Sequence, residues 1–212
     1  MTILLVLILI VLTLWTLWGY VSSRVEQAEY SILEKKKGYE IRLYPQHIVA
    51  QTTVEGDYRT ALNTGFRIVA RYIFGGNIKK QSVAMTAPVV AREDASQKIA
   101  MTSPVVSTQH SLENKNGTRV ISFGMPKSYT LETLPIPTDS RVKLVQIPAE
   151  KYAVKKFSWF ATEKRVKKFE GELLSMLATD HVETLGVVAY AGYDAPWTPP
   201  WMRKQEVLVK VK

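Results

Sequence analysis

The sequence contains no cysteine and only three histidines. The missing cysteine excludes disulfides, zinc–thiolate sites, iron–sulfur clusters and cysteine nucleophiles. The histidines, His47, His110 and His181, lie far apart and match no metal-ligand spacing. The sequence also lacks a glycine-rich phosphate loop, a Gly-x-Ser-x-Gly elbow and a convincing pair of carboxylates. We therefore predict that the protein is not an enzyme.

Acidic residues are fewer than basic ones, 19 against 28, which gives a formal net charge of +9. A basic balance of this kind favours anionic partners, such as lipid headgroups, nucleic acid or an acidic small molecule. No nucleic-acid recognition motif accompanies the charge, so we predict no nucleic-acid partner.

Charge is absent altogether from residues 3–21, a run rich in Leu, Ile and Val that carries Trp15, Trp18 and Tyr20 towards its end. As a helix this run would be about 28 Å long, close to the hydrocarbon thickness of a bilayer. Tryptophan and tyrosine favour the membrane interface. We predict a single-pass membrane anchor over residues 1–22. A cleaved signal peptide is the alternative, although the basic n-region and the Ala-x-Ala site of such peptides are missing.

The remaining residues divide into a juxtamembrane linker over 23–37 and one domain over 38–212, a length typical of a single domain. Basic residues follow the hydrophobic run and none precedes it. This asymmetry favours the cytoplasmic side of the membrane for the domain.

Within the domain, one order of elements occurs twice. In each half, alternating apolar and polar residues predict a β-hairpin, a three- and four-residue period predicts an amphipathic helix, and further strands follow. We expect an α+β fold: a distorted, antiparallel, barrel-like sheet with two helices, built from a duplicated hairpin–helix–strands unit. The predicted elements are hairpins over 39–55 and 142–159, helices over 58–73 and 162–177, and strands over 119–125, 185–193 and 206–211.

A Met-Thr-x-Pro-Val-Val phrase occurs at 85–90 and again at 101–106, with a polar loop between the copies. Because proline cannot donate to a central ladder, each copy should be a short edge or bulged strand, and the two should form one hairpin. One interpretation of the repeat is that both segments are β-strands that pack on a common core. Alternatively, Met85 and Met101 line a pocket for a large apolar ligand, because methionine fills irregular apolar space.

Three further groups of residues could bind a ligand. The first predicted helix carries a basic stripe in which Arg71, near Phe74, could meet a ligand carboxylate, and a solvated helix face is the alternative. A loop rich in Pro and Trp places aromatic rings beside Arg203 and Lys204, and could equally be a rigid surface loop. His47 opens a strand beside a turn, either as an ordinary turn residue or as an axial metal ligand.

Several motifs follow one another in a fixed order through the domain. They are Tyr39-Glu40-Ile41-Arg42-x-Tyr44, Gly65-Phe66, Tyr72-Ile73-Phe74-Gly75-Gly76-Asn77, both Met-Thr-x-Pro-Val strings, Phe123-x-Met125-Pro126, Leu134-Pro135-x-Pro137, and a closing segment from Gly192-Tyr193-Asp194 to Glu206-Val207. Together they resemble the SOUL haem-binding family, over nearly everything from Tyr39 to Lys212.

The resemblance implies a distorted β-barrel with two helices, and non-covalent binding of haem or a related tetrapyrrole in an apolar groove along the first helix. It also implies basic groups near the propionates, and carriage or buffering of haem rather than catalysis. Some members carry a histidine where this chain has Leu43, which leaves axial ligation to His47, a methionine or no protein ligand. Gln205 stands where asparagine is usual. The expected cofactor-binding residues are Asn63, Arg71, Phe74, Met85, Met101, Arg203 and Lys204, with His47 as the candidate axial ligand.

The same duplicated architecture resembles bacterial drug- and effector-binding domains, by analogy of fold alone. The alternative function is therefore a module that binds other small amphipathic molecules.

Overall fold

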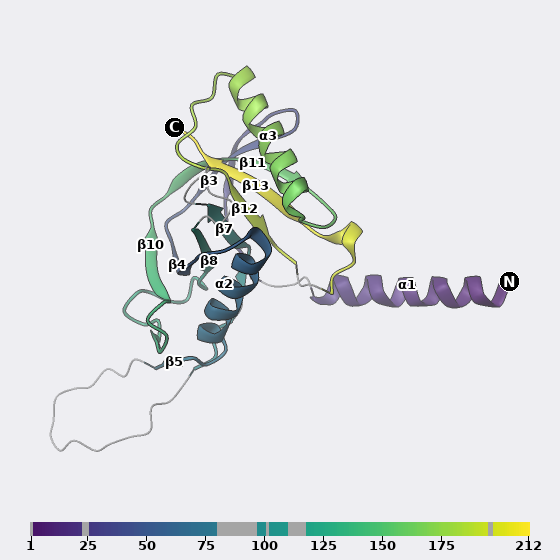
Figure 1. The fold of residues 1–212 in the computed structure, drawn as a ribbon, viewed down its shortest axis with the longest axis horizontal. Coiled ribbons are helices and arrows are strands. Elements are labelled where there is room, and N and C mark those ends of the chain that lie inside the picture. Colours follow the sequence, from purple (N-terminus) through teal and green to yellow (C-terminus); the bar gives the residue numbers. More distant parts are fainter. Residues whose placement is uncertain (1, 23–25, 80–96, 101, 110–117, 195–196) are drawn as a thin grey trace, which may run out of the picture.

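The computed structural model describes residues 2–22, 26–79, 97–100, 102–109, 118–194 and 197–212 (Figure 1). Met101, and the first copy of the repeated phrase with Met85, lie outside the described residues. Most of the strands join one curled, antiparallel, nine-stranded sheet in the order β10-β4-β8-β7-β12-β13-β11-β3-β2. The fold is thus α+β with a half-barrel sheet, as predicted.

The strands of the sheet are β2 (Ser31–Lys35), β3 (Glu40–Tyr44), β4 (His47–Val54), β7 (Val105–Gln109), β8 (Arg119–Gly124), β10 (Lys143–Ile147), β11 (Glu150–Phe157), β12 (Ala189–Gly192) and β13 (Gln205–Lys210). Two small pairs lie outside it, β1 (Glu26–Gln27) with β6 (Thr102–Ser103) and β5 (Asn77–Ile78) with β9 (Ile136–Pro137). The helices are α1 (Thr2–Ser22), α2 (Tyr58–Ile73), α3 (Glu163–Thr179) and the short 3-10 helix η1 (Pro200–Met202).

The two predicted helices of the domain are confirmed together with their N-caps. The Asp57 carboxylate accepts the amide hydrogens of Arg59 and Thr60, both at 3.0 Å, at the start of α2. The Thr162 hydroxyl accepts from the amide of Arg165 at 3.4 Å at the start of α3. Each cap satisfies amides that have no partner within the helix, which fixes where the helix begins.

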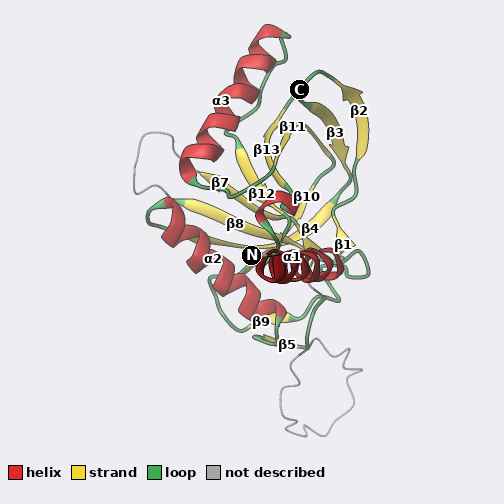
Figure 2. Ribbon diagram, turned by 90° about the vertical axis from the view of Figure 1, so that its right-hand side faces the viewer, coloured by secondary structure: helices red, strands yellow, loops and turns green. Residues whose placement is uncertain are grey.

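The two faces of the sheet differ in what covers them. Ile121 and Phe123 on β8 pack into the core under α2, whereas Val120 and Ser122 alternate with them and point to the other face. Likewise α3 packs on β11 and β13 through Leu173. Both helices lie on this one side of the sheet (Figure 2). The opposite, concave face is therefore free to form a cavity.

Both predicted hairpins are wrong, although all four of their strands exist. β3 and β4 do not pair with each other: β3 pairs with β11, and β4 pairs with β10. Pro45 and Pro148 stand in the two-residue connections that would have made the hairpins. Tight hairpin turns require a positive φ, which the proline ring forbids. Each half of the duplication therefore sends its strands across to the other half.

The N-terminal segment forms one helix, α1, that projects from the domain (Figure 1). Among the described residues, no helix combines the length and the apolar character needed to cross a membrane. The predicted anchor over residues 1–22 thus has no support as a span, and only its helical conformation is confirmed. Part of the predicted linker, Ser31–Lys35, is strand β2 at the edge of the sheet.

Candidate ligand-binding site

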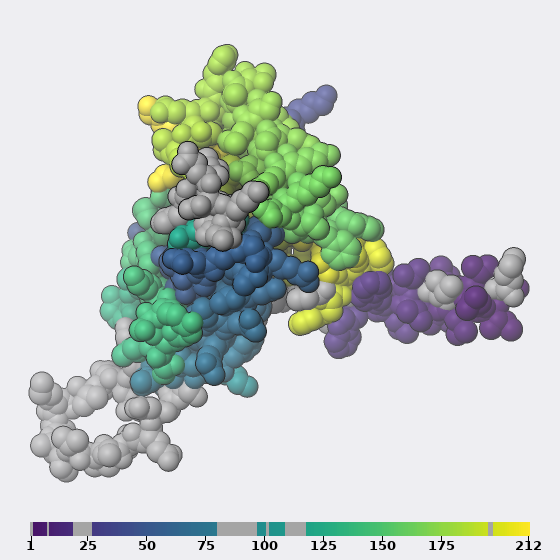
Figure 3. Space-filling model, viewed as in Figure 1, coloured from purple at the N-terminus to yellow at the C-terminus, as the bar shows by residue number. Residues whose placement is uncertain are grey.

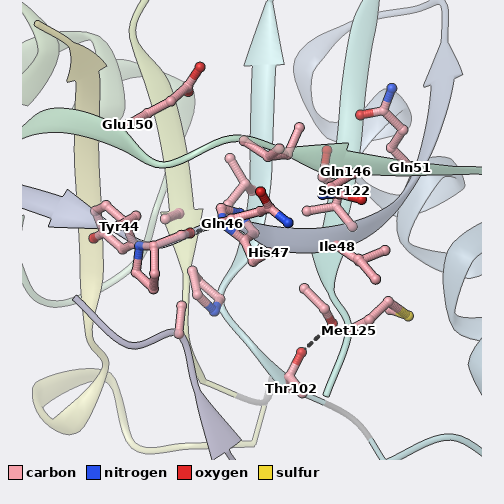
Figure 4. A pocket seen from close by; sticks show the side chains of 18 of the residues that line it. Tyr44, Gln46, His47, Ile48, Gln51, Thr102, Ser122, Met125, Gln146 and Glu150 are labelled. Atoms are coloured by element: carbon pink, nitrogen blue, oxygen red, sulfur yellow. Dashed lines mark hydrogen bonds between the residues drawn. The ribbon is translucent and has the colours of Figure 1, made fainter. Parts of the chain in front are cut away.

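A cavity of about 770 Å³ occupies the concave face of the sheet. Its apolar walls come from alternate residues of neighbouring strands, among them Val49, Val106, Ala191 and Leu208. Gln51, Thr102, Ser122 and Gln146 add polar groups from the strands shown in Figure 4. A volume of this size and a mostly apolar wall with a few polar groups are typical of sites for small organic ligands.

His47 lies in the wall of this cavity at the first residue of β4. Its Nδ1 atom is 2.8 Å from the carbonyl oxygen of Pro45. When Nδ1 carries the proton that this hydrogen bond requires, Nε2 is the ring nitrogen with a free lone pair. A histidine oriented in this way by a backbone carbonyl has the arrangement usual for a metal ligand.

Met125 is also among the residues that line this cavity (Figure 4). It follows β8, and its amide donates to the carbonyl of Ile48 at 2.8 Å, which ties it to the start of β4. The Met125 side chain is buried. The cavity therefore offers a thioether sulfur as well as an imidazole nitrogen.

A buried ion pair forms one end of the concave face. Arg42, on β3, is fully buried, and its guanidinium donates to both carboxylate oxygens of Glu206 at 3.0 and 3.1 Å. It also donates to Glu40 at 2.8 and 2.9 Å and to the hydroxyl of Tyr44 at 3.1 Å. Burial alone would lower the pKa of Arg42, but the hydrogen bonds and charge of Glu206 raise it above its ordinary value.

The tyrosines around this pair keep their protons. Tyr193, in the cavity wall, donates its hydroxyl hydrogen to Glu206. Burial, followed by the nearby charge of Glu206, raises the pKa of Tyr193 above its ordinary value. Burial likewise raises the pKa of Tyr44. Both phenols are thus neutral hydrogen-bonding groups at physiological pH.

A second ion pair lies at the rim. Lys210 donates to Glu150 at 2.6 Å, and the Tyr152 hydroxyl donates to the other carboxylate oxygen at 2.7 Å. Burial would raise the pKa of Glu150, but the hydrogen bonds from Lys210 and Tyr152 lower it. Glu150 and Glu206 each have a cation beside them, so neither presents an unbalanced negative charge to a ligand.

Comparison with known proteins identifies the family of this chain. The model of the SOUL heme-binding protein family matches residues 25–94 and 91–210, which is most of the sequence. The chain belongs to the SOUL haem-binding family. None of the curated proteins matches this SOUL protein individually.

Solved structures similar to this SOUL protein share its fold. The C-terminal domain of EcmrR matches with a TM-score of 0.57 and 10% identity, over 86% of this chain and 98% of that one. EcmrR in complex with DNA matches with a TM-score of 0.59 and 11% identity, over 84% and 59%. A hydrolase from Listeria innocua matches with a TM-score of 0.52 and 14% identity, over 85% and 94%. Likeness at such low identity shows the fold alone.

The site residues predicted from the sequence of this SOUL protein fall in separate places. Asn63, Arg71 and Phe74 lie exposed on or just after α2, across the sheet from the cavity. Arg71 is in the last turn of that helix, where its charge acts on Asp139. Neither the concave cavity nor a second cavity near η1 is lined by Asn63, Arg71 or Phe74.

Arg203 and Lys204 lie between η1 and β13, in the wall of a second cavity of about 520 Å³. Arg203 donates from Nε to the carbonyl oxygen of Thr198 at 2.9 Å, and its guanidinium stacks on Phe160 at 4.9 Å. Arg203 and Lys204 are thus distant in sequence from Arg71, which lies in the last turn of α2. In the part of the chain that the structure describes, the three cations do not form one site.

Sequence reasoning missed the paired charges of the concave face. Arg42 and Glu206 both lie in motifs by which the chain resembles the family, and those motifs indicate the family without pairing the two charges. The available signal was a charged residue at an inward position of each of two strands, which a fold satisfies only by pairing the charges.

Proposed function

We propose that this protein binds haem or a related tetrapyrrole in the concave cavity, with His47 as the axial ligand through Nε2. Membership of the family supports the ligand class. The cavity that contains His47 supports the location, because it is large enough for a macrocycle and already holds an oriented imidazole. The groove along α2 that we expected from the resemblance has the weaker support, since its candidate residues are exposed on a helix surface.

The free energy of haem binding depends strongly on the axial ligand. Burying about 400 Å² of apolar macrocycle contributes on the order of 10 kcal/mol, and association costs at least about 4 kcal/mol. At most about 6 kcal/mol remains, which corresponds to a dissociation constant of tens of micromolar. A bond from iron to His47 would bring the affinity into the micromolar range or below. Such a site suits reversible carriage or buffering of haem.

A titration of haem into the full-length protein tests the proposal. We expect a saturable shift of the Soret band, and His47→Ala should weaken haem binding at least about tenfold, or by ~1.4 kcal/mol. Protoporphyrin IX without iron is the control, because its affinity should be the same for the parent and for His47→Ala. Equal weakening of both ligands would show that the substitution damages the cavity and that His47 does not bind iron.

A pair of variants locates the site. Ser122→Phe fills the cavity floor from β8 and should abolish binding, whereas Arg71→Glu, on α2, should leave it unchanged. The opposite result would place haem along α2. Displacement of haem by amphipathic cations, with little affinity for porphyrin, would instead favour the effector-binding alternative.

A further inference from the structure

Four of the five tryptophans, Trp15, Trp159, Trp197 and Trp201, lie together where α1 meets the domain. The indole Nε1 of Trp15 donates to the carbonyl of Trp197 at 2.9 Å, and its ring meets that of Trp201 at 5.4 Å. Trp18 lies one helical turn further along α1. The amide of Trp159, from the turn before α3, donates to the first residue of η1 at 3.1 Å. The five tryptophans, with Phe160 in edge-to-face contact with Trp159, make up what we call the aromatic face.

The aromatic face is open to solvent. The five tryptophans are between 40% and 66% exposed, and Phe160 is 44% exposed. Tryptophan ordinarily hides most of its large apolar surface in a core. A contiguous exposed patch of this kind marks an interaction site.

Three cations border the aromatic face: Arg165, Arg203 and Lys204. The guanidinium of Arg165 donates to the carbonyl of Ser158, next to Trp159, at 3.0 Å. The nearby acids are both engaged, since Glu163 pairs with Lys167 at 2.9 Å and Asp194 accepts the amide hydrogen of Lys204. The face therefore combines indoles with positive charge.

The helix next to this face points to the identity of its partner. The large apolar side chains of α1 are exposed on every side of the helix, from Ile3 to Trp18. α1 projects from the domain beside the segment that contains η1 (Figures 1 and 3). Exposed apolar side chains, indoles and cations side by side are the groups that a membrane surface accepts at its headgroup level.

We propose that the aromatic face docks the folded domain onto the surface of a lipid bilayer that carries anionic headgroups. Indoles of the loop around η1 enter the boundary between headgroups and acyl chains, and the bordering cations contact the headgroups. The proposal is independent of haem binding, because Trp201, Arg203 and Lys204 line the second cavity and not the concave one; the residues that line both cavities, Gln27 and Tyr193, belong to neither the aromatic face nor its bordering cations.

The experiment uses the full-length protein with Trp15→Phe and Trp18→Phe, so that only the tryptophans of the domain emit. It is mixed with vesicles of phosphatidylcholine, with or without about one third phosphatidylserine, whose acyl chains are brominated close to the headgroup. We expect quenching of the domain tryptophans, stronger with phosphatidylserine. Lys204→Glu should remove the increase caused by phosphatidylserine. Lys143→Glu, an equal change of charge on the exposed edge strand β10, should leave it intact.

Two results would overturn the proposal. One is that the vesicles quench the emission of the parent protein but leave the domain tryptophans of the double variant unquenched, since the helix would then contact lipid without the tryptophans of the domain. The other is a lipid-free dimer, seen by sedimentation velocity, that Trp201→Ser dissociates, since the face would then join copies of this chain.

Discussion

Replacing Arg42 with leucine should destabilise the domain strongly, because it leaves the buried carboxylate of Glu206 without its cation, whereas the partly buried Glu40 keeps Lys156. Arg42 is fully buried and donates four hydrogen bonds of 2.8–3.1 Å to Glu40 and Glu206. Removing one member of a buried ion pair typically costs about 3–5 kcal/mol. Domains have total stabilities of about 5–15 kcal/mol, so the variant should lose a large fraction of its free energy of unfolding.

Urea unfolding of the full-length protein, followed by circular dichroism, measures this loss. The double variant Arg42→Leu with Glu206→Leu should recover most of it, because the charge that lost its partner is then gone. Arg141 provides the matched control. It binds Asp139 with a similar two-pronged geometry, 2.7 and 2.9 Å, but on the exposed surface, so Arg141→Leu should leave the unfolding free energy almost unchanged.

The pH dependence of the single variant adds a second, independent measurement. In Arg42→Leu the carboxyl of Glu206 is buried without a cation, and burial disfavours its charged form. The folded state then binds more protons, and the variant should gain stability as the pH falls. A loss below about 1 kcal/mol at neutral pH, or a double variant as unstable as the single one, would refute the reasoning.

The parent protein should behave in the opposite way in acid. The pKa values of Glu40 and Glu150 lie below the ordinary 4.5, because hydrogen bonds from cations outweigh the effect of burial. The stability that these two carboxylates contribute is complete above their unfolded-state pKa and is lost as the pH falls through their lower folded-state pKa values. An acid titration followed by circular dichroism measures this loss. Stability that does not change below pH 4.5 would contradict it. Gly65→Ala should destabilise by about 1–3 kcal/mol because its Cβ would overlap Ile121, whereas Gly171→Ala, with open space around it on α3, should stabilise by roughly 0.5–1 kcal/mol. Thermal unfolding compares the two alanine variants, and equal shifts would contradict the close packing of α2 on β8.

Local features of the fold could be predicted from the sequence because local interactions decide them. Asp57 and Thr162 cap helices whose apolar residues recur at the helical period, and both helices begin at those caps. The strands were recognised for the same reason, since alternation along a strand reflects its two faces. The pairing of β3 and β4 was mispredicted because adjacency in sequence was given more weight than the proline between them.

The candidate site could be predicted only in part, because it depends on strands that are distant in the sequence. His47 was identified from its position at the start of a strand, but the cavity around it needs β8, β12 and β13 as well. Arg42 and Glu206 are 164 residues apart, and no local pattern pairs them. Arg71 was chosen from a helical stripe, and the fold turns that stripe outward.

Strand β13 is the last strand in the sequence, and it lies in the interior of the sheet between β12 and β11. During synthesis the chain can assemble β10-β4-β8-β7-β12 on one side and β11-β3-β2 on the other. These two partial sheets cannot join before residues 205–210 have left the ribosome. Until then β12 and β11 each expose an edge of unpaired backbone groups, the kind of edge that recruits other chains.

The nascent protein is therefore most prone to aggregation after β12 has emerged and before β13 has done so. A nascent chain that stalls before residues 205–210 have emerged would keep the open edges of β12 and β11 exposed. A chaperone that shields those edges prevents them from pairing with other chains, and it is no longer needed once β13 has inserted between β12 and β11.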